Sequence, residues 1–358
     1  MLFATILIFL GMLLALVLVH EWGHFIVAKK AGCNVEEFGF GFPPRLISKM
    51  WHGTLYSLNL LPIGGFVKIE GEDMNEETPA ATSFASKSAS WRIAILSAGV
   101  VMNLVLAVFL LSVESALGSP TIVTDANRNS LSNIMTYVLE VAPESPAAQA
   151  GLMPYDRIVQ YSAVEQPSIS QIQEATKNAA GTPVAIEVER AGQHQTFTVT
   201  PRVNPPEGQG AIGISMGETG LLQAPWYTAP WHGVQKTAMM TGAIVSQFAG
   251  LIQKLFAHEN VGQVLTGPIG IAIYTKEAAS LGLSYFLEFA AMISINLAII
   301  NILPLPALDG GRILFVIIEK IMGRRVPANV EGYVHTAGFA LLIVLMIAIT
   351  FKDIRHYL

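Results

Sequence analysis

The chain of 358 residues is unusually apolar: 52% of its residues are hydrophobic and 13% are charged, against a charged fraction of about 25% in typical soluble domains. This composition excludes an ordinary soluble globule. The net charge of −5 gives no basic surface for a phosphate backbone, and the single cysteine, Cys33, excludes an intrachain disulfide and a cysteine zinc cluster. The sequence therefore predicts a membrane protein with room for one modest soluble domain.

Four apolar segments contain uncharged runs close to the roughly 20 residues that cross about 30 Å of hydrocarbon. They predict transmembrane helices at residues 1–28, 91–113, 284–309 and 332–351. No basic leader precedes the first segment and no cleavage site follows it, so we expect it to be retained rather than removed as a signal peptide.

Lysine and arginine set the expected orientation of these spans. They crowd the loop at 29–90 and recur in the segment at 310–331, which indicates that both lie on the cytoplasmic side. The long segment between the second and third spans then lies outside, as do both termini. We therefore expect a multi-pass protein of the plasma (inner) membrane.

The segment 225–258 has two interpretations. Its uncharged stretch, 237–253, would make a short fifth span. An interfacial amphipathic helix needs only one apolar face, and Trp226 and Trp231 just upstream are typical of the headgroup level. We expect the interfacial helix.

Residues 117–204 have the composition of a folded soluble module. Ser168 with Gln171 forms a capping box that predicts a helix start, and residues 184–200 predict a hairpin. The stretch VAPESPAAQAGLMPYDRIV resembles the bacterial form of the PDZ domain, although Tyr155 stands where that family usually has glycine. Such a fold accepts an extended peptide at a strand edge. A spacer that only blocks access is the alternative.

Residues 20–24 read H-E-W-G-H inside the first predicted span. In a helix, this spacing puts His20 and His24 on one face, where both imidazoles can bind one metal ion while Glu21 reaches a water. An aspartate at the centre of a membrane helix costs about 3 kcal/mol, and ionisable groups there are generally functional. A polar patch at the membrane surface is the alternative interpretation.

A zinc hydrolase also needs a third protein ligand. Asp309 follows Pro304 and Pro306 at the end of the third predicted span, where the prolines must break the helix. With 225–258 on the outer surface, the first and third spans both run inward, so Asp309 reaches the depth of the histidines. The alternative is a bare helix end stopped by two glycines.

The H-E-W-G-H motif, the PDZ-like insert and the stretch N-I-L-P-L-P-A-L-D-G-G at 301–311 together resemble the site-2 protease family of intramembrane zinc metalloproteases. The resemblance is to the bacterial regulator-of-sigma-E branch, here with a single PDZ domain. It implies Zn²⁺ as the cofactor and His20, His24 and Asp309 as its ligands. It also implies Glu21 as the catalytic base and Asn301 as a substrate-binding residue near the site.

Residues 54–69 are β-prone on both sides of Ile63-Gly64-Gly65, too apolar for a solvated loop and too broken for a span. We expect a hairpin that dips into the membrane, and a cytoplasmic hairpin with a structural role is the alternative. The resemblance implies the family's membrane-reentrant β-sheet, whose edge pairs with an unwound substrate. A lone amide in the second span, Asn103, is explained by helix packing next to Gly99 and is not expected in the site.

The predicted fold is a polytopic α-helical membrane protein with four transmembrane helices, a membrane-reentrant β-hairpin and one inserted extracytoplasmic PDZ-like α+β domain. The expected function is zinc-dependent cleavage of single-span membrane proteins, such as an anti-sigma factor or remnant signal peptides, at an unwound segment toward the cytoplasmic side. Other expected partners are membrane lipid and a peptide in the PDZ-like groove, with no nucleic acid. The alternatives are an ion-coupled transporter with a buried His/Glu/Asp site and a catalytically silent scaffold.

Overall fold

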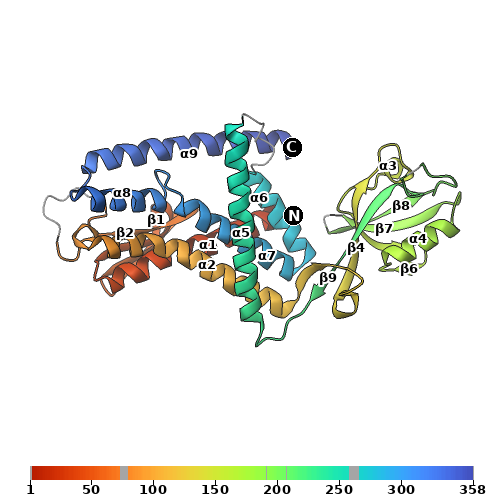
Figure 1. Cartoon of the computed structure of the whole chain (residues 1–358), viewed down its shortest axis with the longest axis horizontal. Coiled ribbons are helices and arrows are strands. Elements are labelled where there is room, and N and C mark those ends of the chain that lie inside the picture. Colours follow the sequence, from red (N-terminus) through yellow and green to blue (C-terminus); the bar gives the residue numbers. More distant parts are fainter. Residues whose placement is uncertain (1, 73–79, 191, 207, 258–265, 358) are drawn as a thin grey trace. The chain divides into compact units, whose positions relative to one another are not determined.

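The computed structural model describes residues 2–72, 80–190, 192–206, 208–257 and 266–357. Parts of four sequence expectations lie outside these residues: residue 1 of the first span, 73–79 of the first loop, 191 of the PDZ-like module and 258 of the interfacial segment. The chain divides into two compact units (Figure 1). One comprises residues 1–112, 230–276 and 287–358, and the other comprises residues 113–229 and 277–286.

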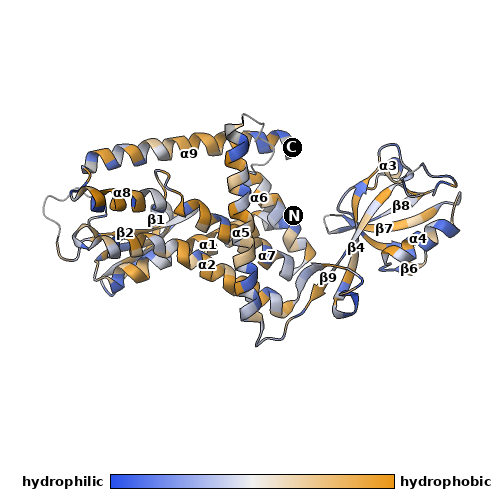
Figure 2. Cartoon of the chain, in the orientation of Figure 1, coloured by the Kyte–Doolittle hydropathy of each residue, from blue (hydrophilic) through white to orange (hydrophobic). Residues whose placement is uncertain are grey.

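Four of the described helices are long and apolar enough to cross a membrane, and Figure 2 shows them mostly in hydrophobic colours. They are α1 (Leu2–Lys30), α2 (Ala89–Leu117), α7 (Leu283–Ile302) and α9 (Ala328–Tyr357). These helices are compatible with the expected four-span architecture. The third helix ends at Ile302 rather than at residue 309, because Pro304 and Pro306 cannot continue it.

Three other helices of the chain are α5 (Ala229–Phe256), α6 (Pro268–Leu281) and α8 (Asp309–Met322). Figure 1 shows α5 running across α1, α2 and α7 rather than alongside them. One side of α5 packs on α2 and α7, where Ile244 joins a buried cluster with Leu111 and Ile295. A helix that buries one face in this way has the amphipathic character that the sequence indicates.

The loop after α1 folds into two long antiparallel strands, β1 (Val35–Trp51) and β2 (Thr54–Ile69). The chain reverses at His52 and Gly53, and it reverses again within β2: residues 55–58 run in the same direction as residues 37–40 of β1, whereas residues 65–69 run in the opposite direction. Gly64 has a φ of 82°, a left-handed conformation that glycine adopts without steric cost. It lies in the part of β2 where the chain turns back, between residues 58 and 65.

This reversal places two parts of β2 on opposite sides of the same part of β1. Phe38, for example, is paired with Tyr56 on one side and with Val67 on the other. The two long strands therefore make a sheet of four short segments. Residues 65–69 form one edge of this sheet, and no other strand among the described residues pairs with that edge.

A buried cluster fixes this small sheet to three helices, one of which, α1, carries the H-E-x-x-H motif. Its central members are Ala28 of α1, Val35 of β1, Ile69 of β2, Ile95 of α2 and Val316 of α8. Fully burying a large aliphatic side chain stabilises a fold by about 1.5–3 kcal/mol. The cluster thus holds α1, α2 and α8 together at one end of the first unit.

The second unit is built on a seven-stranded sheet with the order β3-β9-β4-β5-β7-β8, in which β6 pairs with β5. The strands are β3 (Ser119–Ile122), β4 (Ser132–Val141), β5 (Arg157–Tyr161), β6 (Val164–Glu165), β7 (Val184–Arg190), β8 (Gln193–Val199) and β9 (Ile214–Leu222). Helices α3 (Pro146–Ala150) and α4 (Ile169–Asn178) complete it. Its core includes Val138, Tyr161, Ile172, Ile186 and Val188.

The second unit extends past the boundary that the sequence indicates at residue 204. Its strand β9 pairs with both β3 and β4. The Pro- and Gly-rich stretch at 204–210 has the composition of a linker. The sequence therefore places the domain boundary before β9, although this strand belongs to the same sheet. The predicted capping box is present: the Ser168 hydroxyl accepts from the Gln171 N–H, and the Gln171 side chain accepts from the Ser168 N–H.

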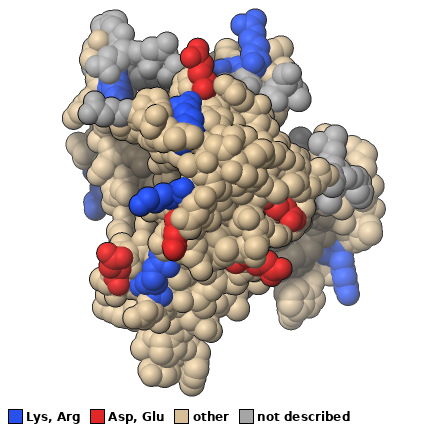
Figure 3. Space-filling model, turned by 90° about the vertical axis from the view of Figure 1, so that its right-hand side faces the viewer, with Lys and Arg blue, Asp and Glu red and all other residues tan. Residues whose placement is uncertain are grey.

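Charged side chains are sparse on the face shown in Figure 3. Among the described residues there, acidic and basic side chains are interspersed within broad uncharged areas, and neither sign gathers in one patch.

Tyr155, where the PDZ family usually has glycine, has a φ of 71° and is 83% exposed. A non-glycine residue in this conformation costs about 1–2 kcal/mol, so the chain keeps the turn at some cost in stability.

Candidate metal centre

The two histidines of the H-E-x-x-H motif lie one turn apart on the same face of α1. Their ring centroids are 4.8 Å apart, and each residue is only 8% exposed. This is the arrangement that an i, i+4 spacing gives in any α-helix. Helix geometry alone therefore brings the two imidazoles together.

Asp309 reaches the histidines because the chain turns sharply after α7. Between Ile302 and Asp309 a non-helical turn redirects it, and Ala307 in this turn has a φ of 70°. The Ala307 N–H donates to Nδ1 of His335 on α9 at 2.9 Å, which ties the turn to the last helix. Asp309 then begins α8, and a helix N-terminus favours a negative charge.

Three ligand atoms converge at this point. His20 Nε2 lies 3.1 Å from Asp309 Oδ2, His24 Nε2 lies 3.4 Å from the same oxygen, and the two Nε2 atoms are 3.2 Å apart. Within the described residues, these three form the one group of His, Cys, Asp or Glu side chains that could hold a metal ion.

The donor set and its spacing fit zinc. Ligand atoms about 2.0–2.1 Å from a tetrahedral zinc ion are about 3.3 Å from one another, which matches the three distances between these atoms. Asp309 Oδ2 is buried, and no described residue gives it a hydrogen bond. A carboxylate oxygen buried between two imidazole nitrogens needs a cation or protons between them, and two histidines with one carboxylate are a common zinc ligand set.

Helix α2 positions the ring of His24. The Nδ1 of His24 donates to the backbone carbonyl of Ile95 at 2.8 Å, and this fixes the tautomer that leaves Nε2 free to bind a metal. Four residues further along α2, Gly99 faces both histidine rings. A Cβ atom at residue 99 would overlap Nε2 of His24 and lie 2.7 Å from Nε2 of His20. The histidine rings therefore occupy the space that a side chain at residue 99 would need.

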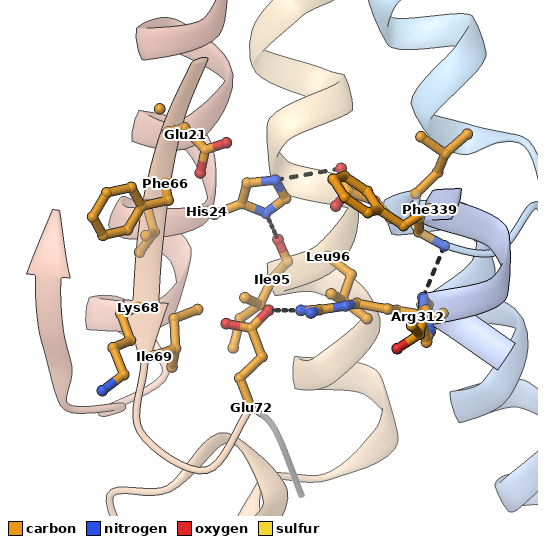
Figure 4. Close-up of a pocket in the computed structure, with 17 residues that line it drawn as sticks. Glu21, His24, Phe66, Lys68, Ile69, Glu72, Ile95, Leu96, Arg312 and Phe339 are labelled. Atoms are coloured by element: carbon orange, nitrogen blue, oxygen red, sulfur yellow. Dashed lines mark hydrogen bonds and ion pairs between the residues drawn. The ribbon is translucent and has the colours of Figure 1, made fainter. Parts of the chain in front are cut away.

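Glu21 stands beside the three ligand atoms without belonging to the group. It lines a cavity of about 640 Å³ on one side and a cavity of about 230 Å³ on the other. Figure 4 shows Glu21, His24 and Phe66 around the larger cavity. Residues 65–69 at the sheet edge border the same cavity, and the ion pair of Arg312 with Glu72 lies at its wall.

The smaller cavity contains two amides. Its lining includes Asn103 of α2 and Asn301 of α7, together with the apolar side chains of Val17 and Leu297. The amide nitrogen of Asn301 is 3.4 Å from Nε2 of His20. The structure thus brings all five sequence-predicted site residues to one place, and it adds Asn103, which the helix-packing interpretation left out.

The family model of peptidase family M50 matches residues 8–345 of this sequence. The chain belongs to peptidase family M50, the site-2 protease family. This confirms the resemblance inferred from the two motifs and the insert. As an M50 peptidase the protein is a zinc metalloprotease with Zn²⁺ as its cofactor, and its apolar helices make it a multi-pass membrane protein.

Curated relatives match this M50 member over nearly its whole length. A protein of Clostridium perfringens, named as a proposed zinc metalloprotease, is 35% identical over 95% of this chain and 95% of its own length. The zinc metalloprotease RasP of Oceanobacillus iheyensis is 31% identical over 98% of this chain and 99% of its own. RasP of Geobacillus kaustophilus is 28% identical over 96% of both chains.

Proposed function

We propose that this protein is an intramembrane endopeptidase that cleaves single-span membrane proteins at an unwound transmembrane segment, such as an anti-sigma factor or a remnant signal peptide. The observation that carries the proposal is the meeting of His20, His24 and Asp309, with Glu21 beside them, among helices apolar enough to span a membrane. Ionisable groups in such a setting mark a functional site.

The proposed roles follow from the position of each group. His20, His24 and Asp309 hold the zinc ion, which when bound acts as a Lewis acid on the scissile carbonyl and makes water a better nucleophile. Glu21 accepts the proton of the attacking water and passes it to the leaving amine. Asn301, beside His20, is placed to hydrogen-bond the substrate backbone.

The edge of the small sheet is the proposed binding surface for the substrate. A transmembrane helix hides its peptide bonds within its own hydrogen bonds, so it must open before hydrolysis. The backbone of residues 65–69 lies at a sheet edge and borders the cavity that contains Glu21 and His24. An opened segment can add to such an edge as a further strand.

The orientation proposed for the chain rests on loop charge and on α5. A helix that crosses the spans, as α5 does in Figure 1, is suited to lie in the plane of the membrane surface. With α5 on the outer surface, α1 and α7 both run inward and the ligands meet toward the cytoplasmic side. The sheet unit between α2 and α5 then lies outside, where its PDZ-like fold is proposed to bind an extended peptide at a strand edge.

Cleavage of a reporter transmembrane span by the purified protein, with and without a zinc chelator, tests the proposed function. We expect Asp309→Asn to lower zinc affinity by more than the 10–100-fold that is typical of changes outside the ligand shell, because a neutral amide oxygen is a weaker zinc ligand than a carboxylate. Zinc content after dialysis and reporter cleavage are measured together. Full zinc occupancy with unchanged cleavage would exclude Asp309 as a ligand.

Pairing with the sheet edge predicts a dependence on substrate helicity. A glycine or proline within the target span should speed cleavage, because each hydrogen bond that must be opened in an apolar medium is costly and the edge replaces only some of them. Initial rates are compared for a polyleucine span and for the same span carrying one proline. Equal rates would count against edge pairing.

The outer unit is proposed to control which substrates reach the site. Residues 120–221 can be removed with a short glycine linker, because Ser119 and Leu222 are paired neighbours in the sheet. The deletion should leave cleavage of a short-tailed span intact and allow cleavage of spans with a large outer domain. If the deleted protein binds zinc but no longer cleaves the short-tailed span, the unit positions substrate rather than restricting access.

A further inference from the structure

We propose that Asn103 is a positioning residue for the metal centre: its carboxamide oxygen accepts a hydrogen bond from Nδ1–H of His20 and so presents Nε2 of that histidine to the zinc ion. The inference rests on the proposed ligand set and adds to it a residue outside the shell of ligands. Asn103 is fully buried on α2, eight residues from Ile95.

The local contacts show an amide aimed at this histidine. The Asn103 amide nitrogen lies 3.2 Å from Nδ1 of His20, while the amide oxygen is buried without a hydrogen-bond partner in the described residues. The Asn103 backbone carbonyl accepts from the Ser294 hydroxyl at 2.8 Å. The residue is therefore held in place, yet its side-chain oxygen has no partner in this amide orientation.

The chemistry of a metal-bound histidine selects the other amide orientation. A neutral imidazole that offers Nε2 to a metal carries its proton on Nδ1, so Nδ1 must donate and cannot accept from an amide NH₂. The two ends of a carboxamide have the same shape. Exchanging them places the oxygen of Asn103 against Nδ1–H of His20, where it accepts the hydrogen bond that the metal-bound tautomer requires.

The second histidine ligand, His24, is oriented by an equivalent hydrogen bond whose acceptor is a backbone carbonyl. Nδ1 of His24 donates to the Ile95 carbonyl at 2.8 Å. Ile95, Gly99 and Asn103 follow one another at four-residue intervals, which places them on one face of α2. This face supplies a hydrogen-bond acceptor for each histidine and, at Gly99, the space for both rings.

Substitution at residue 103 separates this role from helix packing. Leucine has nearly the size of asparagine but no polar atom, and aspartate keeps an acceptor oxygen. Zinc affinity is measured by chelator competition on the full-length protein in detergent, together with the absorption spectrum of the Co²⁺-substituted protein. We expect Asn103→Leu to bind zinc 10–100-fold more weakly with a changed Co²⁺ spectrum, and Asn103→Asp to retain zinc affinity close to that of the wild type.

Matched controls make each outcome decisive. Asn296→Leu removes an amide of α7 whose nitrogen donates to Met292 of its own helix, and it should bind zinc as the wild type does. If Asn103→Leu does not fold, Asn103→Ala is measured in the same way. Wild-type zinc affinity in the folded variant, or an equal loss in Asn103→Asp, would overturn the proposal. A His20→Ala variant with undiminished zinc affinity would instead show that the ligand set is wrong.

Discussion

Replacing Glu21 with glutamine is expected to abolish peptide hydrolysis while zinc stays bound. The Glu21 side chain lies beside the three ligand atoms and lines both cavities, but it is not one of the three. Glutamine has the same size and cannot accept the proton of an attacking water. The loss of a positioned general base typically slows a reaction by about 10²–10⁴-fold. Reporter cleavage and bound zinc are measured on the same preparation.

A matched control for this variant is Glu288→Gln, which changes a carboxylate of α7 that pairs with Lys236 and touches neither cavity lining. It should keep both zinc and cleavage. Normal turnover in Glu21→Gln would remove the general-base role. Loss of zinc from that variant would make Glu21 a ligand instead, and the roles of all four groups would have to be reassigned.

The parts of the site that could be predicted from the sequence depend on short-range geometry. His20 and His24 must share a helix face because they are four residues apart. The prolines at 304 and 306 must end α7, so Asp309 is free to enter the site from a turn. Each of these arguments needs only a few neighbouring residues, and none depends on knowing the tertiary fold.

The parts that could not be predicted depend on partners far along the chain. The glycine pair at 64–65 does not indicate the order of the strand segments, which the long-range pairing sets: residues 37–40 of β1 lie between residues 55–58 and 65–69 of β2. Strand β9 belongs to its sheet through pairs with β3 and β4, on the far side of a stretch that has the composition of a linker. Asn103 contacts His20, which lies 83 residues away in the sequence. From the sequence alone, a lone amide in a span fits helix packing as well as it fits a role in the site.

Gly99→Ala should disable the metal centre by adding a single methyl group. In an exposed helix interior, alanine is favoured over glycine by about 1 kcal/mol, so the substitution on its own would stabilise α2. At residue 99, however, the new Cβ would overlap Nε2 of His24 and lie 2.6 Å from Cε1 of His20. The rings must move away from Asp309, and we expect a loss of zinc affinity of at least 10–100-fold together with loss of cleavage.

Two other glycine-to-alanine variants separate this effect from general crowding. Gly242 on α5 has open space where a Cβ would lie, and Gly23 on α1 faces the Ala98 carbonyl and Met102 rather than a histidine ring. Gly242→Ala should change neither zinc affinity nor cleavage. Gly23→Ala should lower the stability of the α1–α2 contact by about 1–3 kcal/mol, with a smaller effect on zinc than Gly99→Ala. If Gly99→Ala binds zinc as tightly as the wild type, the histidine rings do not occupy the space in front of residue 99, and α2 cannot position them as proposed.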